Sequence, residues 1–334
     1  MRGGRIRRCA VVVVAASATM CASDRAATPD GSPRGTSTTT ATTAAPTSTT
    51  STTTPSTTTM STTTTVPASR RTGRIVQDLV DTDRGRTLRT IVHFPTDASG
   101  ATVREPIPLV LMAHGYRLPA DGYERVLVSV AAAGYVVAAP DFPHTSGSVG
   151  DGDRSDLVNQ PADLSFLIGA LDRLGAPAGA PIPPIADPTK VAVLGHSDGG
   201  LTATAIGYNA NYRDDRVAAV VSMTGGIALY PGSSFVPGGA VPFPPLLAIH
   251  ARADETNGYG ASLSLFNRLP AGVPAYLVSI DGGSHLGPYM FDTAMPEVAA
   301  TIIAFLDLTI RGDAGGVERL RAAAAAPGLE LTER

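Results

Sequence analysis

Short apolar runs alternate with stretches of helical periodicity along most of the chain after about residue 71. Alternation of polar and apolar residues predicts a strand at 86–94. Runs rich in Val, Ile, Leu and Ala predict strands at 108–113, 135–139, 190–194, 217–223, 246–250 and 275–280. Between them, apolar residues at helical spacing predict helices at 124–133, 162–174, 201–208, 262–269 and 298–310. Because the strand runs are mostly continuous in apolar character, we expect an α/β fold with a mainly parallel, doubly wound sheet and helices on both faces.

The first 25 residues have the pattern of a secretory signal peptide. A basic segment, 1–8, precedes an apolar stretch, 9–20, that is too short to span a bilayer, and Ala16-Ser17-Ala18 offers a cleavage site. An uncleaved anchor is the alternative. Lipidation at Cys21 is less favoured, because Met20 stands where a bacterial lipoprotein site takes a small residue. We therefore expect a secreted or cell-surface protein.

Residues 26–70 consist mostly of Thr, Ser, Ala and Pro, without apolar periodicity. Such a segment cannot bury a core, so we expect a disordered stalk, either O-glycosylated or an unmodified spacer. It could attach the protein to the cell envelope. The folded domain is expected at 71–312, followed by an extension at 313–334 whose helix, near 317–325, packs on the outside of the domain.

Composition narrows the possible chemistry. Hydrophobic residues make up 43% of the chain and the formal net charge is −3, so a globular core is expected and a basic nucleic-acid surface is not. Both cysteines, Cys9 and Cys21, precede the folded part, which excludes a disulfide or a thiol nucleophile within it. No metal-ligand spacing, phosphate loop or dinucleotide fingerprint is found, so we expect no metal and no cofactor. His93, His144 and His250 are interpreted as structural.

The strand at 190–194 leads into Gly195-His196-Ser197-Asp198-Gly199-Gly200, and a helix of small residues follows. The G-x-S-x-G pattern is weak by itself in a glycine-rich chain, but between a buried strand and a helix it is typical of a nucleophile elbow. In so tight a turn, side chains at Gly195 and Gly199 would clash. Ser197 is therefore the candidate nucleophile, with an ordinary glycine-rich turn as the alternative.

A serine nucleophile needs a histidine base and an acid that orients it. Only His250 and His285 follow Ser197, and His285 lies in the loop after the last predicted strand, where the base belongs in this chain order. Asp254, after the preceding strand, is the preferred acid. Asp281, four residues before His285, remains the rival, or else a turn-forming residue before a glycine.

Two backbone amides are candidates for binding the oxyanion of an acyl-transfer reaction. One is the N–H of Asp198, next after the nucleophile, and the other is the N–H of Tyr116 in the loop His114-Gly115-Tyr116. His114 is expected to be a buried hydrogen-bonding residue. The Tyr116 side chain could wall an acyl pocket or simply pack.

The loops around this predicted site are short. Residues 227–245 are rich in Gly and Pro and too few for a large cap domain, so we expect an open site. Tyr230, Phe235 and Phe243 could line it, or belong to a plain surface loop. The polar segment 145–161 is expected to form the rim of the same mouth.

These motifs resemble the α/β-hydrolase superfamily, in the branch of bacterial cutinases and polyester hydrolases, platelet-activating-factor acetylhydrolases and chlorophyllases. The resemblance covers about residues 71–311 and is carried by 86–95, 114–116, 134–141, 195–200 and 281–285. It implies an α/β-hydrolase fold, a triad of Ser197, Asp254 and His285, and oxyanion donors at Tyr116 and Asp198. The polyester hydrolases commonly have Met where Asp198 stands, and they carry a tryptophan and a disulfide that this chain lacks.

The sequence therefore predicts a secreted serine carboxylic ester hydrolase that works through an acyl-enzyme, as a monomer, on a small-molecule or polymeric ester. Acyl transfer or peptide cleavage with the same triad is the nearest alternative. A surface-displayed binding module without catalysis is an alternative of another class, suggested by the stalk.

Overall fold

The computed structural model describes residues 70–334 apart from 228–229, 233 and 236–241. The predicted signal peptide and nearly all of the predicted stalk lie outside this part. The described residues contain a nine-stranded sheet with the strand order β1-β2-β4-β3-β5-β6-β7-β8-β9. Its strands are β1 (Arg71–Asp81), β2 (Arg86–Thr96), β3 (Leu109–Ala113), β4 (Val136–Asp141), β5 (Val191–His196), β6 (Val217–Met223), β7 (Leu246–Ala251), β8 (Ala275–Ile280) and β9 (Leu329–Glu333).

The six central strands, β4-β3-β5-β6-β7-β8, are all parallel. Antiparallel pairs flank them: β2 pairs with β4, β1 with β2, and β9 with β8. The carboxyl ends of the parallel strands therefore meet at one edge of the sheet, where sites form in such folds. Arg71 pairs with Thr96 and Glu333 pairs with Tyr276, so β1 begins and β9 ends at the opposite edge.

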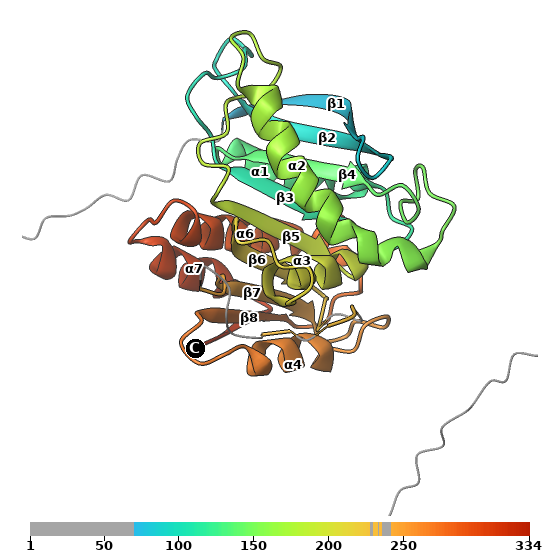
Figure 1. The fold of residues 1–334 in the computed structure, drawn as a ribbon. Coiled ribbons are helices and arrows are strands. Elements are labelled where there is room, and N and C mark those ends of the chain that lie inside the picture. Colours follow the sequence, from blue (N-terminus) through green and yellow to red (C-terminus); the bar gives the residue numbers. More distant parts are fainter. Residues whose placement is uncertain (1–69, 228–229, 233, 236–241) are drawn as a thin grey trace, which may run out of the picture. The chain divides into compact units, whose positions relative to one another are not determined.

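Helices cover both faces of the sheet (Figure 1). One apolar layer packs under α1 (Glu124–Ala132), α5 (Gly287–Met290), α6 (Met295–Thr309) and α7 (Gly316–Ala324). The other packs under α2 (Gln160–Gly175), α3 (Asp198–Tyr208) and α4 (Gly260–Arg268). Two short 3-10 helices, η1 (Ala120–Tyr123) and η2 (Arg154–Asn159), complete the described elements.

Side chains of each central strand divide between the two layers. In β3, Val110 and Met112 join the first layer, whereas Leu109 and Leu111 join the second. All four are fully buried, and burial of an aliphatic side chain contributes roughly 1.5–3 kcal/mol. Continuous apolar runs in the sequence follow from this two-sided burial. The expected α/β fold, with a parallel sheet between two helical layers, is thus confirmed.

The two outermost strands of the sheet, β1 and β9, were not expected. Strand β1 was not predicted: six of its eleven residues are exposed, three of them in a row at 76–78, so it shows neither a buried apolar run nor a regular alternation. Strand β9 was not predicted either: its five residues, Leu-Glu-Leu-Thr-Glu, include two glutamates, and all five are exposed or half-buried. The segment 313–334 therefore contains not only the helix α7 but also a strand that extends the sheet, so it is not an extension outside the domain.

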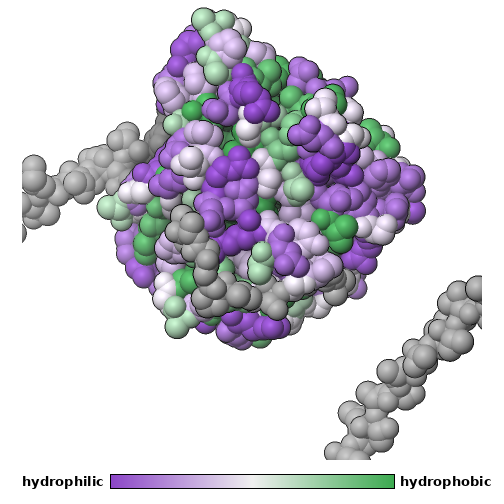
Figure 2. All heavy atoms as spheres, in the orientation of Figure 1, coloured by the Kyte–Doolittle hydropathy of each residue, from purple (hydrophilic) through white to green (hydrophobic). Residues whose placement is uncertain are grey.

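The connection between β6 and β7 spans residues 224–245, in line with a fold without a large cap. No helix in the described part of the chain is long and apolar enough to cross a membrane. Hydrophilic and hydrophobic residues are intermixed on the face of the molecule that Figure 2 shows.

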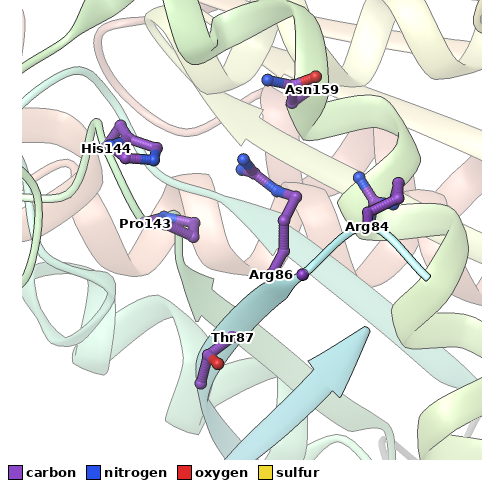
Figure 3. A pocket seen from close by; sticks show the side chains of 7 residues that line it. Arg84, Arg86, Thr87, Pro143, His144 and Asn159 are labelled. Atoms are coloured by element: carbon purple, nitrogen blue, oxygen red, sulfur yellow. The ribbon is translucent and has the colours of Figure 1, made fainter. Parts of the chain in front are cut away.

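A polar pocket lies beside the turn between β1 and β2 (Figure 3). It is lined by Arg84, Gly85, Arg86, Thr87, Pro143, His144 and Asn159. The Arg86 guanidinium binds both oxygens of Asp156 at 2.8 Å and both oxygens of Asp163 at 2.7 Å, and Arg84 binds Asp163 at 2.8 Å. The positive charges of Arg84 and Arg86 are thus already neutralised by the carboxylates of Asp156 and Asp163. These ion pairs join the β1–β2 turn to η2 and α2.

We expect Arg86→Met to lower the free energy of unfolding by about 3 kcal/mol, because it leaves two buried carboxylates short of their main partner. Urea unfolding at pH 7 measures the loss. Arg71→Met is the matched control: Arg71 is exposed and has no ion pair among the described residues. Equal stability of the two variants would contradict the role given to Arg86.

Candidate functional site

Ser197 lies in the sharp turn between β5 and α3, with φ 56° and ψ −120°. A side chain in this sparsely populated region costs roughly 1–3 kcal/mol, and such strain is typical of functional sites. The glycines on either side make the turn possible. A Cβ on Gly195 would lie 1.9 Å from the carbonyl oxygen of Gly199, and a Cβ on Gly199 would lie 2.1 Å from that of Ala113. The turn thus has the geometry that the sequence predicts for a nucleophile elbow.

His285 and Asp254 lie together at the carboxyl ends of β8 and β7. The Nδ1 atom of His285 is 2.8 Å from Oδ2 of Asp254, and both side chains are almost fully buried. The other oxygen of Asp254 accepts hydrogen bonds from the amides of Thr256 and Asn257, each at 2.8 Å. Burial would raise the pKa of Asp254, but the hydrogen bonds from His285 and these amides outweigh it and leave the pKa lowered. Asp254 is therefore an ionised carboxylate that fixes one tautomer of His285.

The rival acid, Asp281, lies away from His285. Its side chain is 71% exposed and pairs with Arg252 at 3.2 Å. His250, by contrast, lies next to Asp254: its Nε2 atom is 3.3 Å from Oδ2 of Asp254 and 2.9 Å from the carbonyl oxygen of Asn257. Both neighbours are acceptors, so this nitrogen carries a proton. His250 thus contacts the same oxygen of Asp254 as His285 does and helps to hold that carboxylate, a more specific role than the structural one expected.

His196 brings the elbow next to the His285 loop. Its Nε2 atom is 2.8 Å from the carbonyl oxygen of His285, and the two imidazole rings are 4.8 Å apart. Within the described residues, Ser197 Oγ makes no hydrogen bond to His285. Catalytic hydrogen bonds are often long in unliganded enzymes and tighten when substrate binds.

The two amides expected to bind an oxyanion have no hydrogen-bond partner among the described residues. Asp198 is the first residue of α3, where an N–H has no partner inside the helix. Tyr116 lies in a turn closed by a 3.0 Å bond from the Leu118 amide to the Gly115 carbonyl oxygen. A Cβ on Gly115 would lie 3.3 Å from Cβ of Ser197, so the turn lies against Ser197. Two unpaired donors beside Ser197 are what an oxyanion hole requires.

The rim of the site is fixed by an ion pair that the sequence did not reveal. Arg154, in η2, binds both oxygens of the buried Asp198 carboxylate at 2.6 and 2.7 Å. The Tyr116 hydroxyl donates to the carbonyl oxygen of Gly152 at 2.5 Å. The side chains of Tyr116 and Asp198 thus hold the segment 145–161 next to the turn at Ser197, while their amides have no partner among the described residues. The Asp198 side chain points to Arg154 rather than to a reacting group.

Of the two alternatives for the aromatic residues of 227–245, lining the site or belonging to a loop beside it, the structure favours the second for Phe235 and Phe243. Both pack around Tyr208, with ring centroids 5.3 and 6.1 Å away. Tyr208 ends α3, which begins beside Ser197, so about 15 Å of helix separate this cluster from the nucleophile. Tyr230 is buried, and its hydroxyl bonds Thr202 and the carbonyl oxygen of Leu157. These rings pack α3 and η2.

The other histidines have structural partners. His114 is buried; its Nε2 atom accepts from the Phe142 amide at 3.0 Å, so its Nδ1–H donates to the Gly115 carbonyl oxygen at 2.8 Å. His93 bonds Glu124 at 3.0 Å, and the exposed His144 bonds Asp151 at 3.4 Å. In residues 70–334, as far as they are described, no group of three or more His, Cys, Asp or Glu could hold a metal ion.

Comparison with known protein families agrees with this geometry. The family model of the alpha/beta hydrolase family matches residues 110–333, about two thirds of the chain. The chain belongs to this family. The match to the alpha/beta hydrolase family extends from β3 to β9, includes Ser197, Asp254 and His285, and supports hydrolase activity. A search among curated proteins gave no match.

Buried histidines should make this alpha/beta hydrolase sensitive to acid. Burial lowers the pKa of His93, His114, His196 and His250, for His196 to about 3. The unfolded chain takes up protons at these residues near pH 6.5, whereas the folded chain does not, so stability is complete above that pH and falls as pH decreases. Each histidine should remove up to about 1.4 kcal/mol per pH unit from the free energy of unfolding. Urea unfolding at pH 7.5, 6 and 5 tests this, and equal stability at all three would contradict it.

Proposed function

We propose that this protein is a serine carboxylic ester hydrolase with Ser197 as nucleophile, His285 as general base and Asp254 as the acid that orients the base. The observation that carries the proposal is the meeting of three features at one edge of the sheet: the strained serine turn, the buried Asp254–His285 pair and the unpaired amides of Tyr116 and Asp198. Together they supply the nucleophile, the proton acceptor and the charge stabilisation of acyl transfer.

In the proposed reaction, His285 Nε2 takes the proton of the Ser197 hydroxyl as its oxygen attacks the ester carbonyl. Asp254 stabilises the imidazolium that forms. The oxyanion is bound by the amides of Tyr116 and Asp198, and the alcohol leaves with the proton from His285. Water then attacks the acyl-enzyme with His285 again as base, which releases the acid and restores Ser197.

The resemblance to cutinases, platelet-activating-factor acetylhydrolases and chlorophyllases supports an ester as the substrate. The short connection between β6 and β7 favours an accessible site and is compatible with a polymeric ester. The basic and apolar segments of residues 1–20 and the Thr/Ser-rich stretch support export, with attachment to the cell envelope through the stalk.

We expect Ser197→Ala to reduce kcat for p-nitrophenyl esters at least about a thousandfold, because it removes the attacking oxygen. Initial rates with acetate through octanoate esters measure the effect, and their profile gives the length of the acyl pocket. Ser264→Ala, at an exposed position of α4, is the control and should keep the wild-type rate. A wild-type rate in Ser197→Ala would refute the assignment. Transfer of the acyl group to an added alcohol in preference to water would favour an acyltransferase.

We expect Asp254→Asn to lower kcat by about 10³–10⁴-fold, because the amide no longer stabilises the imidazolium or fixes the tautomer of His285. Asp281→Asn, the matched change in the exposed carboxylate, should stay within about twofold of the wild type. The same p-nitrophenyl ester assay compares them. A larger loss in Asp281→Asn than in Asp254→Asn would reverse the assignment of the acid.

A further inference from the structure

We propose that Tyr123 is a positioning residue of this site. Together with His196, it fixes the relative positions of the loop 114–116, the turn at Ser197 and the loop that carries His285. The proposal rests on the proposed esterase function. Tyr123 ends η1, lies 74 residues before Ser197 in the sequence, and was not suggested by any motif. Its side chain is fully buried.

The Tyr123 hydroxyl bridges two of the loops directly. It is 3.0 Å from the amide nitrogen of Gly115, the residue before the oxyanion donor Tyr116, and 2.8 Å from Nδ1 of His196, the residue before the nucleophile. His196 continues the chain to the third loop through its Nε2 atom, 2.8 Å from the carbonyl oxygen of His285. One phenol and one imidazole thus connect the segments after β3, β5 and β8.

Only one arrangement of protons satisfies every group in this series of hydrogen bonds from Gly115 to His285. The His285 carbonyl oxygen can only accept, so His196 Nε2–H donates to it. Because burial keeps His196 neutral, its Nδ1 has no proton and accepts from the Tyr123 hydroxyl. The hydroxyl oxygen in turn accepts from the Gly115 amide. Every donor has one acceptor, and the side chains are fully buried, where an unmade hydrogen bond costs the full desolvation penalty.

The position of these hydrogen bonds, next to the proposed reacting groups, distinguishes them from ordinary core packing. At one end they fix the peptide next to the amide of Tyr116, and at the other they fix the backbone of the base itself. Positions of reacting groups affect rate steeply, since a displacement of about 1 Å can cost a hundredfold. Loss of the Tyr123 hydroxyl should therefore lower the rate of reaction at Ser197 more than it lowers substrate binding.

The chain offers a matched control in Tyr289. This tyrosine is also fully buried and also contacts His196, with ring centroids 5.0 Å apart. Its hydroxyl, however, donates to the carbonyl oxygen of Ile249 at 3.2 Å and takes no part in the chain from Gly115 to His285. Tyr123→Phe and Tyr289→Phe thus remove the same atom from equally buried rings next to the same histidine.

The experiment compares both variants with the wild-type full-length chain in p-nitrophenyl butyrate hydrolysis and in labelling of Ser197 by a fluorophosphonate, which uses the same base and oxyanion donors. In Tyr123→Phe, kcat and the labelling rate constant should fall about tenfold to a hundredfold, with KM within about threefold. Tyr289→Phe should stay within about threefold in all three. The Tm of each variant shows whether the loss follows stability.

Equal rates in the two folded variants, or losses that follow Tm, would overturn the positioning role while the esterase function stands. If Tyr123→Phe does not fold, His196→Gln is the substitute. It has carbon at the δ position, where His196 has the Nδ1 acceptor of the Tyr123 hydroxyl, and keeps an N–H donor at the ε position, so kcat and labelling should fall as in Tyr123→Phe. Absence of both hydrolysis and labelling in the wild type would refute the esterase function and the positioning role together.

Discussion

The close approach of backbone segments in the turn at Ser197, which leaves no space for a side chain at Gly195 or Gly199, is the constraint on which the site depends. The carbonyl oxygen of Gly199 occupies the space that a side chain at Gly195 would need, and the carbonyl oxygen of Ala113 does the same for Gly199. Strand β5, helix α3 and the end of β3 therefore approach each other more closely than any other residue type would allow. This approach leaves the amide of Asp198 at the start of the helix without a partner among the described residues and places it beside the turn that carries Tyr116.

The parallel direction of the central strands then determines which loops lie near Ser197. Strands β3, β5, β7 and β8 all end at the same edge, so the loop of Tyr116, the turn at Ser197, and the loops of Asp254 and His285 come together although 169 residues separate His285 from Tyr116. Strand ends alone do not set ångström-scale distances between side chains. Polar contacts do that here: the buried pair of Asp254 and His285, the buried hydroxyl of Tyr123 between two loops, and the ion pair of Asp198 with the partly exposed Arg154.

Much of the fold and of the candidate site could be predicted because local signals agree with the global arrangement. The runs at 217–223 and 275–280 have the same bounds as β6 and β8, since strands buried on both faces leave an unbroken apolar pattern. The turn at Ser197 was detectable because its backbone geometry requires glycine at 195 and 199, which gives a recognisable pattern in the sequence. The pairing of His285 with Asp254 followed from chain order and the position of strand ends.

Other features could not be predicted because they depend on contacts between distant residues. Arg154 and Asp198 are 44 residues apart, Tyr123 and His196 are 73 apart, and no local pattern marks either pair. Strands β1 and β9 were missed because one edge of each is unpaired among the described residues and their exposed side chains interrupt the apolar pattern. For Phe235 and Phe243, nearness to the site in the chain order suggested a role that packing against Tyr208 rules out.

The direction of the antiparallel edge strands has a practical consequence. Arg70 bonds to the carbonyl oxygen of Ala132, ahead of β4, and Arg334 exchanges hydrogen bonds with Ala275, at the start of β8. Both ends of the described domain thus lie at the margin of the sheet remote from Ser197. A solid support joined to the domain through Arg70 or Arg334 would therefore be attached at the margin remote from Ser197 and would leave Ser197 accessible from the bulk solution.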